Sequence, residues 1–104
     1  MKEFNTDVLT WYAYENRKDF EEFSDKFVPV LMNAVDSAKS AGEAGFYLEM
    51  GENGTDEPCF RTEVWGDAYE ALCNLDESEE GRVVATNLAI MAFYAISHNT
   101  ILNS

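Results

Sequence analysis

The chain has 104 residues, 46% hydrophobic and 13% aromatic, which is enough to build one folded core. Twenty acidic residues against seven basic ones give a formal net charge of −13, which excludes direct binding to nucleic acid or to an anionic membrane. Two cysteines are too few for a disulfide framework, and the first residues lack the apolar stretch of a signal peptide. We therefore expect one cytoplasmic domain over residues 1–104, with free thiols.

A first helix is predicted over residues 7–16, directly after a group of good N-capping residues. Val8 and Tyr12 lie four positions apart and therefore share one face of this helix. Arg17 and Lys18 follow it and suit its C-terminal end, where positive charge is favourable.

A second helix is predicted to begin at a cap formed by Asp19. Its apolar residues recur at three- and four-residue steps and form one stripe: Phe20, Phe23, Phe27, Val30, Leu31, Ala34, Val35 and Ala38. Pro29 cannot donate a backbone hydrogen bond, so we expect either a kink there or two separate helices. The glycines of the segment 40–45 are expected to end the helix.

A β-hairpin is predicted next, because residues 46–50 and 59–65 alternate apolar and polar side chains across a loop at 51–58. One face of the second strand is expected to carry Phe60, Thr62 and Val64. Arg61 opposite Glu49 would form a favourable cross-strand pair. A two-stranded sheet is marginal alone, so helices must cover one of its faces.

The last third of the chain contains its most apolar stretch, Val83–Ile96, which predicts a helix buried on most sides. Acceptors that can cap its start precede it, among them Asp76 and Ser78, and His98 suits its end. Before this helix, Asp67 is expected to cap Ala68–Cys73, a short helix or a third strand, of which the helix is preferred. The fold class expected is α+β, with a small antiparallel sheet packed against three to four helices around a central buried C-terminal helix.

Catalytic and metal-binding motifs are weak. Asp76–Asn87 resembles the start of a calcium loop, but Asn87 stands where the bidentate Glu is required. His98 is the single histidine, and Cys59 and Cys73 are too far apart for a CxxC zinc site. No nucleophile with an adjacent base is visible, so we expect no catalysis, no cofactor and no metal.

The negative charge is concentrated between residues 40 and 81, where twelve acids and one base give a net charge of −11. Self-repulsion at this density costs stability, so a partner that uses the charge is a better explanation than solubility alone. The residues expected to contact the partner are Glu52, Asp56, Glu57, Asp67, Glu70, Asp76, Glu77, Glu79 and Glu80. Amphipathic aromatic residues offer a different interface: Trp11, Tyr12, Tyr14, Tyr47, Trp65 and Tyr69.

Two short segments resemble a known family. Gly45-Phe46-Tyr47-Leu48 followed by Glu52-Asn53-Gly54, and Ser78-Glu79-Glu80-Gly81 leading into an apolar helix that ends at Ser97-His98, are similar to segments of the ArdB/KlcA-type antirestriction proteins. The resemblance implies a small α+β domain, encoded by a phage, plasmid or genomic island, that relieves host DNA restriction by protein–protein contact without a cofactor.

The function expected is therefore that of a small, acidic, non-enzymatic inhibitor. Its partner would be a basic nucleic-acid-handling protein of the host, such as a restriction enzyme, a CRISPR effector or another nuclease. The alternative is an oligomeric adaptor that works through its aromatic surface, with the charge serving solubility. The sequence leaves the partner's identity and the oligomeric state open.

Overall fold

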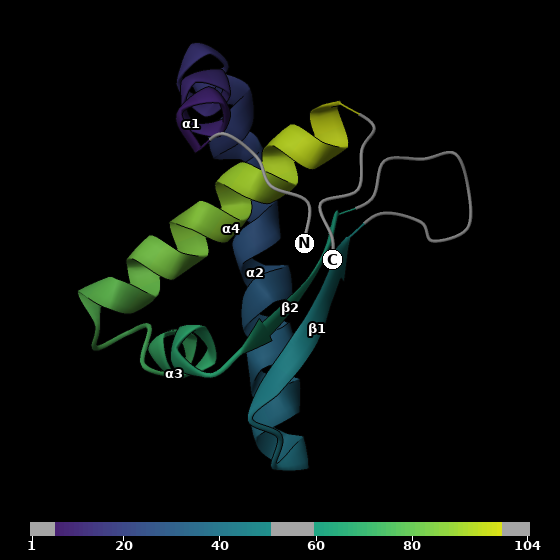
Figure 1. The fold of residues 1–104 in the computed structure, drawn as a ribbon, viewed down its shortest axis with the longest axis vertical. Helices are drawn as coiled ribbons and strands as arrows, with labels where there is room; N and C mark the ends of the chain where they lie inside the picture. The colour runs from purple at the N-terminus through teal and green to yellow at the C-terminus, as the bar shows by residue number, and fades with distance from the viewer. Residues whose placement is uncertain (1–5, 51–59, 99–104) are drawn as a thin grey trace.

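The computed structural model describes residues 6–50 and 60–98 (Figure 1). Within these residues the elements are, in order, α1 (Thr6–Glu15), α2 (Arg17–Ala41), β1 (Gly45–Met50), β2 (Phe60–Trp65), α3 (Asp67–Cys73) and α4 (Glu79–Ser97). β1 and β2 form a two-stranded antiparallel sheet. The predicted α+β fold class is confirmed. No helix among the described residues is long and apolar enough to cross a membrane.

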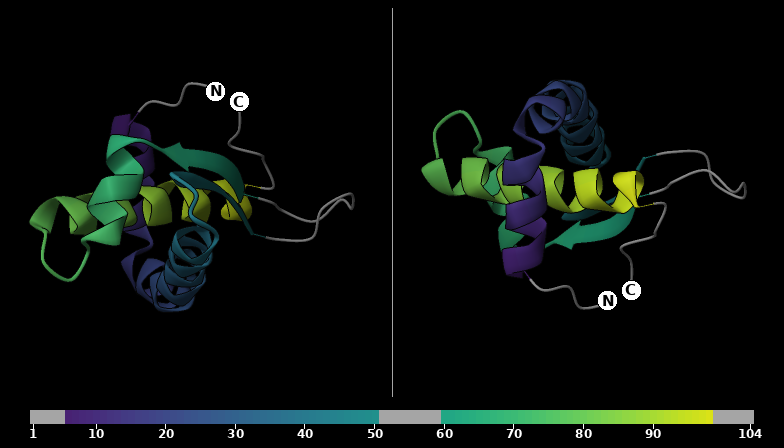
Figure 2. Two further views of the ribbon diagram at one scale, coloured as in Figure 1. Left: turned by 90° about the horizontal axis from the view of Figure 1, so that it is seen from below. Right: turned by 90° about the horizontal axis from the view of Figure 1, so that it is seen from above.

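Helix α4 lies at the centre, as expected, with α2 on one side and the sheet on the other (Figure 2). It packs against α1, α2, α3 and β2. Its buried residues are Gly81, Ala85, Leu88, Ala89, Ala92, Phe93 and Ala95. The prediction that this helix is buried on most sides was wrong for its first half. There Val83 is 54% exposed, and Thr86 and Asn87 face solvent. The neighbouring elements cover only the alanine-rich side there.

The two ends of α4 are fixed by capping residues. Ser78 is the N-cap, and its Oγ accepts a hydrogen bond from the Gly81 N–H at 3.4 Å. His98 occupies the C-cap position, and its ring Nδ1 lies 3.0 Å from the Tyr94 carbonyl oxygen. The helix therefore begins four residues before the apolar run, because Glu79 and Glu80 form its first turn.

Helix α2 runs through Pro29 as one continuous helix, so a division at this residue does not occur. Pro29 has no N–H to donate to the Asp25 carbonyl oxygen. Both residues are exposed, so water can donate to this oxygen instead. The apolar stripe of α2 packs inward except for Val30, which is 39% exposed. Gly42 ends the helix in the left-handed conformation, with φ 74°, as the glycine-rich segment predicts.

The junction between α1 and α2 is tighter than expected. Asn16, and not Asp19, is the N-cap residue of α2, and its side chain donates back to the Tyr12 carbonyl oxygen at 2.9 Å. Arg17 and Lys18 consequently belong to the first turn of α2 and do not extend the end of α1. Asn16 therefore lies at the end of α1 and at the start of α2 at once, with no further residue between the two helices.

The hairpin confirms the predicted strands and their faces for the described residues. Glu49 lies directly opposite Arg61, as expected. Phe60, Thr62 and Val64 are buried on the inner face, together with Phe46 and Leu48 of β1. The loop at 51–58 and Cys59 lie outside the described residues.

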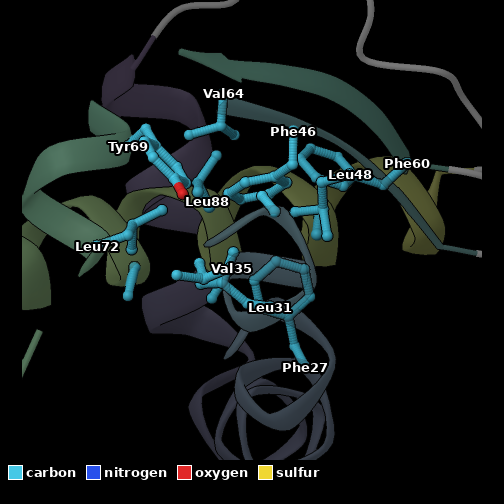
Figure 3. Close-up of a cluster of buried hydrophobic side chains, with 14 of the residues drawn as sticks. Phe27, Leu31, Val35, Phe46, Leu48, Phe60, Val64, Tyr69, Leu72 and Leu88 are labelled. Carbon is cyan, nitrogen blue, oxygen red and sulfur yellow. The ribbon is translucent and has the colours of Figure 1, made fainter. Parts of the chain in front are cut away.

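The core forms where the inner sheet face meets α2, α3 and α4 (Figure 3). Large side chains from these elements fill it: Phe27, Leu31 and Val35 of α2, Phe46 and Leu48 of β1, Phe60 and Val64 of β2, Tyr69 and Leu72 of α3, and Leu88 of α4. Because the small residues of α4 allow close approach, the aromatic and branched side chains of its neighbours supply most of the buried volume.

The segment Ala68–Cys73 is helical, which resolves the choice between helix and strand. Gly66, and not Asp67, occupies the N-cap position, and Asp67 is the first helical residue. Asp67 therefore contributes negative charge to the helix N-terminus without capping it.

Candidate acidic interface

Six acidic residues line adjoining hollows where α3 runs into α4. The junction of these two helices lies at the lower left of Figure 1. We call this region the acidic corner: Asp67, Glu70, Asp76, Glu77, Glu79 and Glu80. All six residues are exposed. Residues 67–82 hold these six acids and one base, Arg82, so the formal net charge of this stretch is −5.

The turn that connects α3 to α4 is held by local hydrogen bonds and by one apolar side chain. Asn74 Nδ2 donates to the Glu70 carbonyl oxygen at 3.0 Å. The Leu75 N–H donates to the Leu72 carbonyl oxygen at 3.2 Å, and the Glu77 N–H to that of Asn74 at 2.9 Å. Leu75 also packs against the core. These contacts place the acids at defined positions on a supported turn.

Gly81 brings the start of α4 against the end of α3. A Cβ atom at this position would collide with the Ala71 carbonyl oxygen. The absence of a side chain therefore allows the two helices to approach closely, and acids from both helices reach one surface.

Two open hollows lie on the acidic corner and share Glu77 and Ser78. The first, of about 420 Å³, is lined by Asp76, Glu77, Ser78, Glu79, Arg82, Val83, Thr86 and Asn87. The second, of about 470 Å³, is lined by Asp67, Glu70, Ala71, Asn74, Glu77, Ser78 and Glu80. Carboxylates at the rims of such hollows can accept hydrogen bonds from lysine or arginine side chains of a partner.

None of the six carboxylates forms an ion pair within 4.0 Å with a described residue. Asp67 and Glu70 occupy the first turn of α3, and Glu79 and Glu80 the first turn of α4. Negative charge at a helix N-terminus is worth about 0.3–1 kcal/mol at low ionic strength. The fold thus tolerates this charge density at two helix starts, and the carboxylates stay open to solvent.

The structure brings six of the nine predicted contact residues together, and Glu52, Asp56 and Glu57 lie outside the described residues. Sequence reasoning missed Asn74, Arg82, Thr86 and Asn87 as lining residues. A signal for part of this set was present, because residues 79, 82, 83, 86 and 87 follow the spacing of one helix face.

A calcium loop at Asp76–Asn87 is excluded by the backbone. Residues 79–87 are helical, whereas an EF-hand loop must wrap around the cation with ligands from its first to its twelfth position. Among the described residues, no group of three or more His, Cys, Asp or Glu side chains is placed to hold a metal ion.

The aromatic residues proposed as an alternative interface separate into two groups. Tyr12 packs edge-on against His98, with ring centroids 4.6 Å apart, and Tyr69 is buried in the core. Burial, and next a hydrogen bond with Cys73, raise the pKa of Tyr69 above its ordinary value. The other four are exposed: Trp11 and Tyr14 on α1, and Tyr47 and Trp65 on the outer face of the sheet.

Comparison with protein-family models, curated proteins and solved structures finds no match for this chain. The resemblance to the ArdB/KlcA-type antirestriction proteins accordingly stays a prediction.

Proposed function

We propose that the protein is a small non-enzymatic inhibitor that presents the acidic corner to a basic, nucleic-acid-handling protein in the cytoplasm. The observation that supports this is the convergence of six exposed carboxylates from α3, the turn and α4 on one supported surface. Rigid carboxylates can occupy lysine and arginine pockets that are built for phosphates. The partner would lose access to nucleic acid through mimicry or steric blocking.

The partner class follows from the charge. A restriction enzyme, a CRISPR effector or another nuclease carries a broad basic groove, which attracts a protein of net charge −13. The same chemistry would suit a counter-defence protein of a phage or plasmid, as the resemblance implies. Attraction of this kind accelerates association more than it strengthens the final complex.

A charge-matched pair of variants tests the proposal. The first, Glu77→Gln, Glu79→Gln and Glu80→Gln combined, removes three charges from the acidic corner. The second, Asp19→Asn, Glu22→Gln and Asp25→Asn combined, removes three charges from exposed positions on α2. Each exposed ion pair contributes roughly 0–1 kcal/mol, so only the combined change at the corner is expected to matter.

The partner is first recovered from a bacterial lysate with the unmodified protein and identified by mass spectrometry. Its association rate is then measured at low and high salt, with and without a short DNA duplex. We expect slower association for the acidic-corner variant only, weaker binding at high salt, and competition by the duplex. Affinity that is independent of salt, without competition by the duplex, would refute the proposal.

The alternative function is an oligomeric adaptor that binds through aromatic side chains. The specific observation in its favour is that Trp11 and Trp65 remain 59% and 54% exposed in the folded chain. Replacing either tryptophan by alanine would then abolish partner binding, while the charge-reduced corner variant would bind normally.

A further inference from the structure

Helix α1 is apolar on two opposite faces. Its inner face contributes Leu9 and Ala13, both buried against the rest of the fold. Its outer face carries Val8, Trp11 and Tyr14, spaced three residues apart and therefore aligned along the helix. These three residues are 45%, 59% and 68% exposed. Exposed aromatic side chains in such a row are typical of contact surfaces and not of a solvated helix face.

We infer that this outer face of α1, Val8–Trp11–Tyr14, is a docking site for an apolar helical segment of a basic protein partner. The inference goes beyond the acidic corner, because it assigns a second surface on a different helix. Tyr14 and Trp11 would supply the buried aromatic contacts that usually dominate binding energy, whereas the corner would supply attraction at a distance.

The charges on α1 indicate the chemistry of the occupant. Asp7 and Glu15 stand near the two ends of the exposed row, and α1 contains no base. Two exposed bases, Arg17 and Lys18, follow at the start of α2, where Arg17 lies 3.9 Å from Glu21. A partner helix with lysine or arginine beside its apolar stripe complements this pattern. An acidic partner would meet repulsion both here and from the whole chain.

A second copy of this chain fits less well. Two copies would each bring a net charge of −13 to the contact. The exposed parts of the three side chains amount to roughly 350 Å², from the area that such side chains can bury. A stable interface needs about 800 Å² per partner, so the row suits one part of a larger heterologous contact.

The chain contains its own reporter for the test. It has two tryptophans, so Trp65→Phe leaves Trp11 as the only one. The probe is a synthetic amphipathic peptide of roughly 18 residues, five helical turns, with leucine on one face and lysine elsewhere. A peptide with glutamate in place of lysine is the charge control, and phosphatidylcholine vesicles and the protein alone at rising concentration test the other occupants.

We expect the lysine peptide to shift Trp11 emission to shorter wavelength, with saturation in the micromolar range, and the glutamate peptide to leave it unchanged. Tyr14→Glu should weaken this binding by about tenfold or more. Tyr47→Glu is the matched control, because it places the same charge on another exposed tyrosine, on the sheet. It should leave binding within about twofold, with folding of both variants verified by circular dichroism.

Three results would overturn the inference: no shift with the lysine peptide, an equal shift with the glutamate peptide, or equal weakening by Tyr14→Glu and Tyr47→Glu. A shift with the vesicles or with protein concentration alone would assign the face to a membrane surface or to self-association instead. A peptide that binds only at the acidic corner leaves Trp11 emission unchanged. Failure here is therefore distinguishable from failure of the proposed function, which the salt-dependent rates test separately.

Discussion

Gly81 provides the sharpest test of how α3 and α4 are joined. In an exposed helix interior, Gly→Ala stabilises a protein by about 1 kcal/mol, because alanine restricts the unfolded chain and favours the helix. Here the added Cβ would collide with the Ala71 carbonyl oxygen, which belongs to backbone and cannot rotate away. Overpacking of this kind costs about 1–3 kcal/mol or more. We therefore expect Gly81→Ala to give no net stabilisation and to destabilise the protein by up to about 2 kcal/mol, once the propensity gain is subtracted from the overpacking cost.

Urea unfolding followed by circular dichroism measures this change as a lower midpoint at unchanged slope. Thr86→Ala is the matched control, since it adds helix propensity at an exposed position of the same helix and should be neutral or slightly stabilising. If Gly81→Ala raised the midpoint as an ordinary helix glycine does, the close approach of α3 and α4 would be refuted, and with it the geometry of the acidic corner.

Three further predictions concern the rest of the fold. Phe60→Ala should cost about 3–5 kcal/mol because the ring is fully buried, whereas Val83→Ala should cost less than about 0.5 kcal/mol; equal losses in urea unfolding would contradict the assigned burial. Pro29→Ala should raise the thermal midpoint, since it restores a donor for the residue 25 carbonyl in a continuous helix, and a lower midpoint would argue against continuity. Because the pKa of Tyr69 is raised in the folded state, its contribution to stability is fully present below the unfolded value of 10.0 and is lost as pH rises through the folded value. Tyr69→Phe should therefore lose stability less steeply above about pH 10 than the unmodified protein in pH-dependent urea unfolding, and identical slopes would contradict this.

Local pattern was sufficient for the hairpin and for the central helix. Alternation predicted the inner face of β2. Glu49 and Arg61, which were expected to be a favourable pair if they lay opposite each other, do lie opposite each other in the sheet. The apolar run at 83–96 predicted a helix, although its first turn is acidic. Ser78, one of the two acceptors expected to cap this helix, is its N-cap, so the helix begins at Glu79, before the apolar run.

Tertiary contacts decided what the local pattern could not. The missing N–H of Pro29 favours a break in the helix. However, α2 packs on the core through the side that faces away from Pro29, and the helix continues through the proline. Val83 belongs to the apolar run and yet lines an open hollow, since none of the elements formed by residues 6–50 and 60–98 covers that side of α4.

The residues of the acidic corner could be predicted from the sequence, but their arrangement could not, because it depends on a tertiary contact. Its residues are evident from composition, but their convergence depends on the approach of α3 to α4 at Gly81, which no spacing rule supplies. Arg82 lines the corner although its charge is positive, and its place there follows from the helix face that it shares with Glu79 and Val83.

The alanine-lined side of α4 limits how this chain can change over generations of mutation. Its inward-facing residues are alanines, the smallest residues that favour a helix: Ala85, Ala89, Ala92 and Ala95. Any substitution there enlarges the residue and pushes apart α2 and the sheet, or else introduces glycine and weakens the helix. The phenylalanines and leucines around α4 can exchange with other apolar residues of similar volume. Substitutions should thus be tolerated in the elements that surround α4, whereas the inward-facing alanines of α4 should tolerate few changes.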